Sequence, residues 1–136
     1  MAGNPYKTDI LTSEAVDLLK EMIAIPSPSF SEDAVCTHIC NWMETKGMPY
    51  ERRGNNIICR NSPASPKPLL MMCAHIDTVS PSEGYDFHPY KPDYAQATEI
   101  LGLDEEFVAV LGSNDDGGSV VSMISTFSGI AGVSSV

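Results

Sequence analysis

One short run of residues restricts the fold more than any other part of the chain. Leu69 to Ala74 reads Leu-Leu-Met-Met-Cys-Ala, a continuous apolar run between a loop rich in Pro and Ser and a histidine. A strand covered by helices on both faces of an α/β sheet has this pattern. We therefore predict an α/β protein in which this run is a buried strand that ends at His75.

Two helices are predicted before that strand. Thr12 to Ile25 has apolar residues at helical spacing, and Pro26 and Pro28 end the helix. Ser31 is positioned to cap a second helix, which Gly47 closes. The predicted buried face of this second helix consists of Val35, Ile39, Trp42 and Met43. Cys36 and Cys40, one turn apart around His38, are interpreted as buried small hydrophobic residues, with a metal site as the alternative.

The remaining elements are shorter. Met48 to Arg53 and Ile57 to Arg60 are predicted to pair as strands around a turn at Asn55 and Asn56. Ser80 to Asp104 is predicted to be a long irregular loop. A second apolar strand is predicted at Phe107 to Leu111. A polar, Gly-rich turn follows it and leads into a helix at 119–127.

Composition limits the functional classes. The chain has 136 residues, 43% of them hydrophobic, which is enough for one domain with a core. Its net charge of −10 gives no basic surface for nucleic acid or for an anionic membrane. Met1 to Thr8 lacks the pattern of a secretory signal, so we expect a cytoplasmic protein with reduced cysteines.

His75 and Asp77 lie two residues apart after the predicted strand, so in an extended chain their side chains point to the same side. A neutral imidazole binds zinc through one ring nitrogen, and a carboxylate that accepts a hydrogen bond from the other fixes its orientation. Ligands of open α/β sheets bind at the carboxyl ends of strands, where this pair would lie. A solvated surface histidine is the alternative.

A second polar group lies between the second apolar strand and the last helix. The run 112–118 reads Gly-Ser-Asn-Asp-Asp-Gly-Gly and places Asp115 beside Asp116. Adjacent carboxylates repel each other, and a divalent cation would neutralise at least one of them. One carboxylate can also bridge two ions about 3.5–4 Å apart. The alternative is a hydrated turn that caps the helix.

Together these segments resemble the zinc aminoacylase, carboxypeptidase and acetylornithine deacetylase family of metallopeptidases. The resemblance covers most of the chain and rests on Ile25-Pro26-Ser27, on the run 73–79 around His75, and on the run 112–118 around Asp115. It implies a three-layer α/β sandwich with a mixed, mostly parallel sheet. Residues 1–136 would form the N-terminal portion of the catalytic domain, without the dimerisation or lid domain.

The resemblance also implies roles for individual residues. His75 would bind one metal ion, Asp77 would belong to the catalytic group as the residue that orients His75, and Asp115 would bridge both metals. Asp116 would be a neighbour of the ligands, and the peptide bond between Asp115 and Asp116 would be cis. Gly117 departs from the family, many members of which carry Lys there.

The implied activity is hydrolysis of amide bonds in N-acyl amino acids or short peptides, with acetylornithine-like substrates favoured. Two divalent ions, zinc or alternatively cobalt or manganese, would serve as cofactors. A Glu-Glu pair and later ligands of this family have no counterpart in the 136 residues, so we expect an inactive truncation by itself and a possible homodimer at full length.

Two other interpretations remain open. The chain could be a non-catalytic α/β module that binds a partner through an unprotected C-terminal helix, because 117–136 carries no charge. It could also be an acidic α/β domain without metal. Metal analysis of the wild type beside His75→Ala distinguishes these interpretations.

Overall fold

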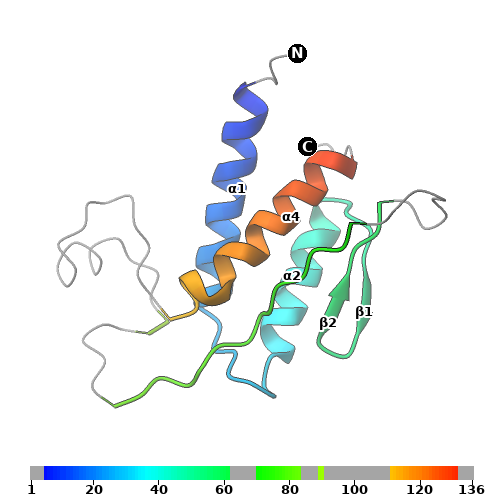
Figure 1. The fold of residues 1–136 in the computed structure, drawn as a ribbon. Helices are drawn as coiled ribbons and strands as arrows, with labels where there is room; N and C mark the ends of the chain where they lie inside the picture. Colours follow the sequence, from blue (N-terminus) through cyan, green and yellow to red (C-terminus); the bar gives the residue numbers. More distant parts are fainter. Residues whose placement is uncertain (1–4, 62–69, 84–88, 91–110, 132–136) are drawn as a thin grey trace.

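The computed structural model of the chain describes residues 5–61, 70–83, 89–90 and 111–131 (Figure 1). Helices α1 (Pro5–Ile23) and α2 (Asp33–Thr45) come first, and the hairpin of β1 (Glu51–Arg53) and β2 (Asn56–Ile58) follows. An extended segment, residues 70–83, crosses beside the helices. The turn Ser113–Gly117, called the Asp turn below, leads into α4 (Gly118–Ala131).

Helix α1 confirms the predicted helix and extends it toward the N-terminus. It begins at Pro5 rather than Thr12, and proline is well suited to the first turn of a helix. Its apolar stripe buries Leu18, Met22 and Ile23, as the spacing predicted. The helix ends at Ile23, two residues earlier than predicted, because Ile25 bonds three residues back, to Met22, ahead of Pro26.

Helix α2 has most of the predicted buried face, with Trp42 only partly buried against the core, but it has a different start. Its buried residues are Val35, Cys36, Ile39, Cys40 and Met43, which confirms the two cysteines as packing residues. Glu32, not Ser31, occupies the N-cap position, and no side chain caps the helix. The prediction for Ser31 is wrong because Ser31 belongs to the preceding turn, where its N–H donates to the Pro28 carbonyl at 2.8 Å, and lies one position before the N-cap.

The C-terminus of α2 confirms the predicted glycine cap. Gly47 has a φ of +64°, and its N–H donates to the Glu44 carbonyl at 3.0 Å. The N–H of Met48 donates to the Met43 carbonyl at 2.9 Å, which completes a Schellman motif. Met43 and Met48 are both buried, so the cap is joined to the hydrophobic core.

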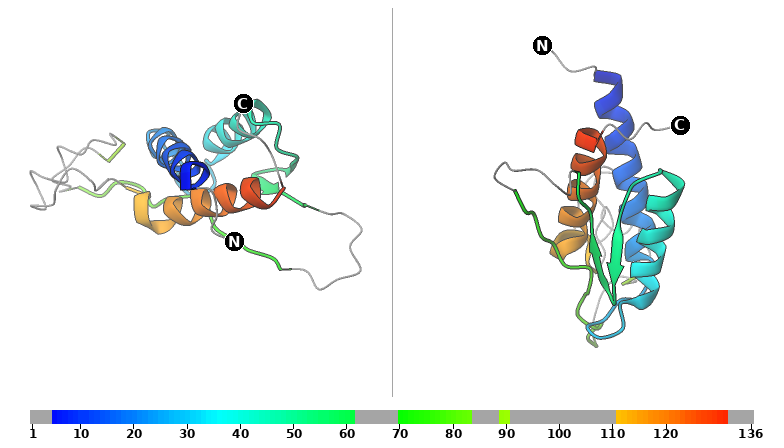
Figure 2. Two further views of the ribbon diagram at one scale, coloured as in Figure 1. Left: turned by 90° about the horizontal axis from the view of Figure 1, so that it is seen from above. Right: turned by 90° about the vertical axis from the view of Figure 1, so that its right-hand side faces the viewer.

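The hairpin lies beside α2 and also confirms the predicted pairing (Figure 2). Its strands are antiparallel and shorter than predicted, with Arg53 opposite Asn56. Gly54 and Asn55 therefore form the two-residue loop, one position earlier than the predicted turn. Gly54 has a φ of +61°, which a glycine adopts without steric cost.

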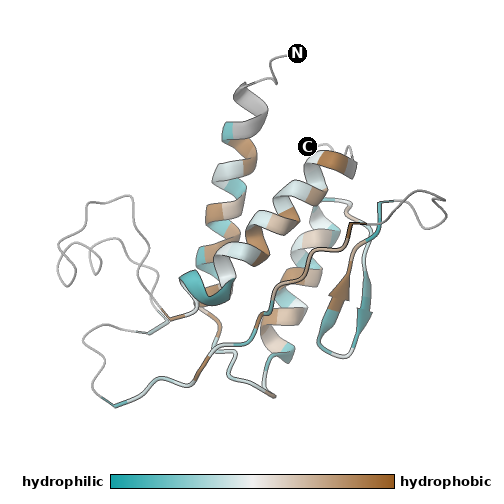
Figure 3. Ribbon diagram, in the orientation of Figure 1, coloured by the Kyte–Doolittle hydropathy of each residue, from teal (hydrophilic) through white to brown (hydrophobic). Residues whose placement is uncertain are grey.

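Helix α4 packs mainly on α1, and its apolar face completes the core. The Asp turn that precedes it is hydrophilic, in contrast to the apolar stripes of the helices (Figure 3). The core residues come from three helices and one loop: Leu18, Met22, Val35, Ile39, Met43, Met48, Val120, Val121 and Ile124. The uncharged helix therefore has a covered face, although Ile130 near its end is 66% exposed.

The predicted buried strand before His75 is wrong for the residues that the structure describes. Leu70 is 87% exposed and Met71 is 82% exposed, and residues 70–74 form no strand. A strand needs hydrogen-bonded neighbours, and the described pairing of this segment is an isolated parallel bridge between Pro28 and Thr78. Without neighbouring strands, the apolar side chains remain in solvent.

The other predicted elements have different outcomes. Most of the long loop and of the second apolar strand, together with His88, lies outside the described residues. The described sheet is the two-stranded hairpin, so the three-layer sandwich remains a prediction. In the described part of the chain, no helix has the length and apolarity needed to cross a membrane.

Candidate metal centre

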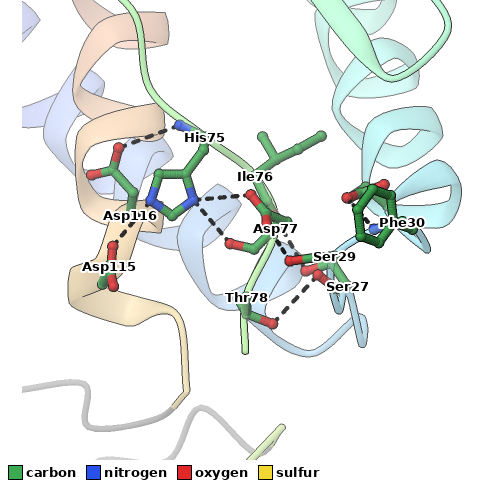
Figure 4. Close-up of polar contacts among 10 residues, drawn as sticks. Ser27, Ser29, Phe30, His75, Ile76, Asp77, Thr78, Asp115 and Asp116 are labelled. Carbon is green, nitrogen blue, oxygen red and sulfur yellow. Dashed lines mark hydrogen bonds and ion pairs between the residues drawn. The ribbon is translucent and has the colours of Figure 1, made fainter. Parts of the chain in front are cut away.

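Three segments far apart in the sequence meet around His75 (Figure 4). The extended segment provides His75 and Asp77, the Asp turn provides Asp115 and Asp116, and the loop after α1 provides Ser29. Asp115 and Asp116 lie on one side of the imidazole, and Asp77 lies on the other. The structure therefore brings the predicted site residues together.

The loop after α1 fixes the position of the extended segment. The N–H of Thr78 donates to the Ser27 carbonyl at 2.8 Å, and the Ser27 hydroxyl donates to the Ile76 carbonyl at 3.1 Å. Ser27 is 4% exposed and stands before Pro28, which restricts it to extended backbone. The loop can therefore lie beside residues 76–78 in the way a short strand would.

Two glycines let the Asp turn approach the other segments closely. Gly112 has a φ of +81°, and a Cβ there would lie 2.6 Å from Thr78 Cγ2. A Cβ at Gly117 would lie 2.7 Å from the Gly112 carbonyl oxygen and 2.8 Å from Leu19 Cδ1. A lysine in place of Gly117, as in many members of the family described above, would not fit this packing without a shift of the backbone.

The imidazole of His75 has partners on both ring nitrogens. Nε2 lies 3.0 Å from Asp115 Oδ1, although the two residues are 40 positions apart. Nδ1 lies 3.0 Å from the Asp77 carbonyl oxygen and 3.2 Å from Asp77 Oδ1. The backbone N–H of His75 donates to Asp116 Oδ2 at 3.3 Å, so Asp116 holds the peptide chain rather than the ring.

The backbone of the Asp turn has an unusual form. The peptide bond between Asp115 and Asp116 is cis, as the family resemblance implied. Both residues have φ and ψ angles outside the helical region, so the turn is a separate structure before α4. Its geometry directs the Asp115 side chain toward His75.

Hydrogen bonds determine the ionisation of the central pair. Two hydrogen bonds raise the pKa of His75 above its usual value. The larger contribution comes from the bond to the Asp77 carbonyl, and a smaller one comes from the bond to the Asp115 carboxylate. The hydrogen bond from Ser29 is the main reason that the pKa of Asp77 is lowered. Three carboxylates surround a single imidazole, which gives the site a negative charge that a cation would neutralise.

The distance between His75 and Asp115 can be compared with metal geometry. Zinc binds imidazole nitrogen at about 2.0–2.1 Å and carboxylate oxygen at about 2.0–2.2 Å, so two such ligands of a tetrahedral ion lie about 3.3–3.4 Å apart. The observed separation of 3.0 Å is within a few tenths of an ångström of that spacing. The two side chains are in hydrogen-bond contact here, and they would have to separate by a few tenths of an ångström to share an ion.

The described residues supply fewer ligands than the three or four of most zinc sites, so weak binding is expected from this chain. Among the described residues, no group of three or more His, Cys, Asp or Glu side chains is arranged to hold a metal. Asp77 contacts Nδ1 of His75 and Asp116 contacts its backbone N–H, which leaves Asp115 as the carboxylate that faces Nε2. The side chain of Asp115 is 89% exposed, so water or further donors can reach it.

Sequence reasoning missed the serines of the loop after α1. The Ser29 hydroxyl donates to Asp77 Oδ2 at 2.6 Å across 48 positions. The signal that could have indicated this loop is the order Pro26-Ser27-Pro28-Ser29, in which Pro28 imposes extended backbone on Ser27 before it. His38 lies elsewhere, on α2, with its Nε2 2.9 Å from Glu21 Oε2.

The chain has a distant similarity to a known protein. No protein-family model matches the chain. A probable carboxypeptidase of Emericella nidulans is 28% identical over 130 residues, which cover 90% of this chain and 28% of that protein. The chain therefore spans about a quarter of the length of its curated relative. This similarity supports the interpretation of the chain as part of a peptidase-like hydrolase.

Proposed function

We propose that this chain supplies His75 and Asp115 to the metal centre of a hydrolase that cleaves amide bonds. The observation that carries the proposal is the 3.0 Å separation of His75 Nε2 and Asp115 Oδ1, which lie on different segments. The negative charge around the imidazole and the similarity to a carboxypeptidase support it. Zinc is the favoured metal because imidazole and carboxylate are its usual ligands.

The residues divide the work between binding and orientation. His75 and Asp115 would hold the metal, and the carbonyl and carboxylate of Asp77 would keep a proton on Nδ1 so that Nε2 is free to bind. His75 and Asp115 would be among the residues that hold the divalent ions, and these ions would supply a Lewis acid for the amide carbonyl and an activated water. Asp116 would hold the backbone at His75 through its N–H.

The substrate class in this proposal is an N-acyl amino acid or a short peptide, with acetylornithine-like compounds preferred. The described residues supply two metal ligands, and no general base is assigned among them. We therefore expect little hydrolysis from the 136-residue chain by itself. A partner-binding module without catalysis has less support, because α4 buries Val120, Val121 and Ile124 in the core.

The decisive experiment is a zinc titration of the metal-free 136-residue chain against a chromophoric chelator. We expect measurable zinc binding by the wild type and at least about tenfold weaker binding by His75→Ala and by Asp115→Ala. His38→Ala removes a histidine that lies outside the site, beside Glu21, and serves as the matched control. Equal binding by the wild type and His75→Ala would contradict the proposal.

A further inference from the structure

We propose that Ser29 is a positioning residue of this metal centre, which acts by holding the carboxylate of Asp77 in place beside His75. The inference rests on the proposed function and extends it to a residue with no ligand role of its own. Ser29 lies in the loop after α1, far from the metal ligands in sequence and on a different segment.

A continuous chain of polar contacts joins Ser29 to the metal ligands (Figure 4). The Ser29 hydroxyl donates to Asp77 Oδ2 at 2.6 Å, the usual length of a charge-assisted hydrogen bond between a hydroxyl and a carboxylate. The other oxygen, Oδ1, lies 3.2 Å from His75 Nδ1. The two oxygens of Asp77 are thus divided between a fixed donor and the imidazole.

The loop that carries Ser29 is fastened to the extended segment independently of Asp77. Backbone and side-chain bonds join Ser27 to Thr78 and to Ile76, and Pro28 pairs with Thr78. The Ser31 N–H donates to the Pro28 carbonyl at 2.8 Å and closes a turn around Ser29. Because the backbone is held on both sides, the hydroxyl is delivered to Asp77 in a defined place.

The size of the effect follows from how Nδ1 is shared. The Asp77 carbonyl oxygen lies 3.0 Å from Nδ1, slightly nearer than the carboxylate oxygen at 3.2 Å. The carbonyl would therefore retain part of the orientation of the ring after Ser29 is removed. Loss of such an outer partner weakens metal binding by about 10–100-fold, and we expect the lower end, about tenfold.

The test compares five variants of the 136-residue chain in the zinc titration. Ser29→Ala should bind zinc about tenfold more weakly, and Ser29→Thr, which restores a hydroxyl, should recover most of that loss. Ser31→Ala changes an exposed serine of the same loop and should bind as the wild type does. In an Asp77→Ala background, the Ser29→Ala change should have no further effect, since its target is gone.

A second readout separates positioning from a general role in folding. Nitrogen NMR of His75 in the zinc-loaded protein should report a proton on Nδ1 in the wild type and a weaker Nδ1–H hydrogen bond in Ser29→Ala. An unchanged Nδ1 signal and unchanged zinc affinity in Ser29→Ala, with weaker binding by Asp77→Ala, would overturn the role of Ser29 and leave the metal centre intact. Equal zinc binding by the wild type and His75→Ala would instead remove the proposed function.

Discussion

Leu18 in α1 is 1% exposed, whereas Leu70 in the extended segment is 87% exposed, although both lie in apolar parts of the sequence. Helix α1 satisfies its own backbone hydrogen bonds and needs a neighbour along one face. Helix α4 provides that neighbour within the described chain. An extended segment has no internal hydrogen bonds, so its backbone needs neighbouring strands, and its apolar side chains are covered only where another layer packs on the faces of that sheet. In this structure the helices therefore have their hydrogen bonds and a packing partner, whereas residues 70–74 lack neighbouring strands.

The largest expected effect tests this difference with one substitution in each region. Leu18→Ala should lower the free energy of unfolding by about 2–5 kcal/mol, because it leaves a cavity in the core. Leu70→Ala should change it by no more than about 0.5 kcal/mol, because the side chain is exposed. Denaturant unfolding of the 136-residue chain measures both. A similar loss for the two variants would mean that Leu70 is covered in solution.

A pair of glycines gives the next largest effect and tests how closely the two regions are joined at the site. Gly117→Ala should destabilise the protein by about 1–3 kcal/mol, because the new Cβ meets a backbone oxygen. The expected contact is 2.7 Å from the Gly112 carbonyl. Gly129→Ala in α4 should stabilise it by up to about 1 kcal/mol, because alanine favours helix. Its Cβ would make an ordinary contact of 3.8 Å with Leu11 Cδ1.

Thermal and denaturant unfolding should therefore give opposite signs for these two alanines. Zinc affinity adds a second comparison, because Gly117 belongs to the Asp turn and Gly129 lies in α4. A Gly117→Ala variant with wild-type stability would show that the turn can move away from Leu19 at little cost.

The smallest effect concerns the pH dependence of the packed region. The hydrogen bond from Tyr50 to Glu44, 2.5 Å long, is the main cause that raises the pKa of Tyr50 to about 12. A raised pKa in the folded state means that this stabilising contribution is present below the ordinary value of about 10 and is lost as the pH rises toward 12. Glu44→Gln should shift the tyrosine ultraviolet titration toward lower pH. An unchanged titration curve would contradict the bond.

The helices and the hairpin could be predicted because their signals are local. The spacing of Leu18 and Met22, the glycine at 47 and the pairing around Gly54 each depend on a few neighbouring residues. The N-cap of α2 was mispredicted because the turn at Pro28, closed by the Ser31 N–H, places Ser31 one position before the N-cap. The buried strand was mispredicted because its stability depends on strands distant in sequence.

In the candidate site, too, the features with local sequence signals could be predicted and those that depend on distant residues could not. The spacing of His75 and Asp77 and the acidic turn at Asp115 could be read from the sequence, and the structure brings them together. The contribution of Ser29 could not be read, because it depends on a loop 48 residues away that is fastened beside Thr78. The sharing of Nδ1 between the carbonyl and the carboxylate of Asp77 also required coordinates.

The cysteines offer a practical consequence for experiments on this site. Cys36 and Cys40 are buried and Cys59 is half-buried, whereas Cys73 is exposed. Burial raises the pKa of Cys36 and Cys59, so their reactive thiolate forms are disfavoured. Under native conditions, a maleimide or a nitroxide reagent would therefore attach first at Cys73, two residues before His75. The natural sequence thus carries a handle for fluorescence or spin labelling at the edge of the candidate metal centre.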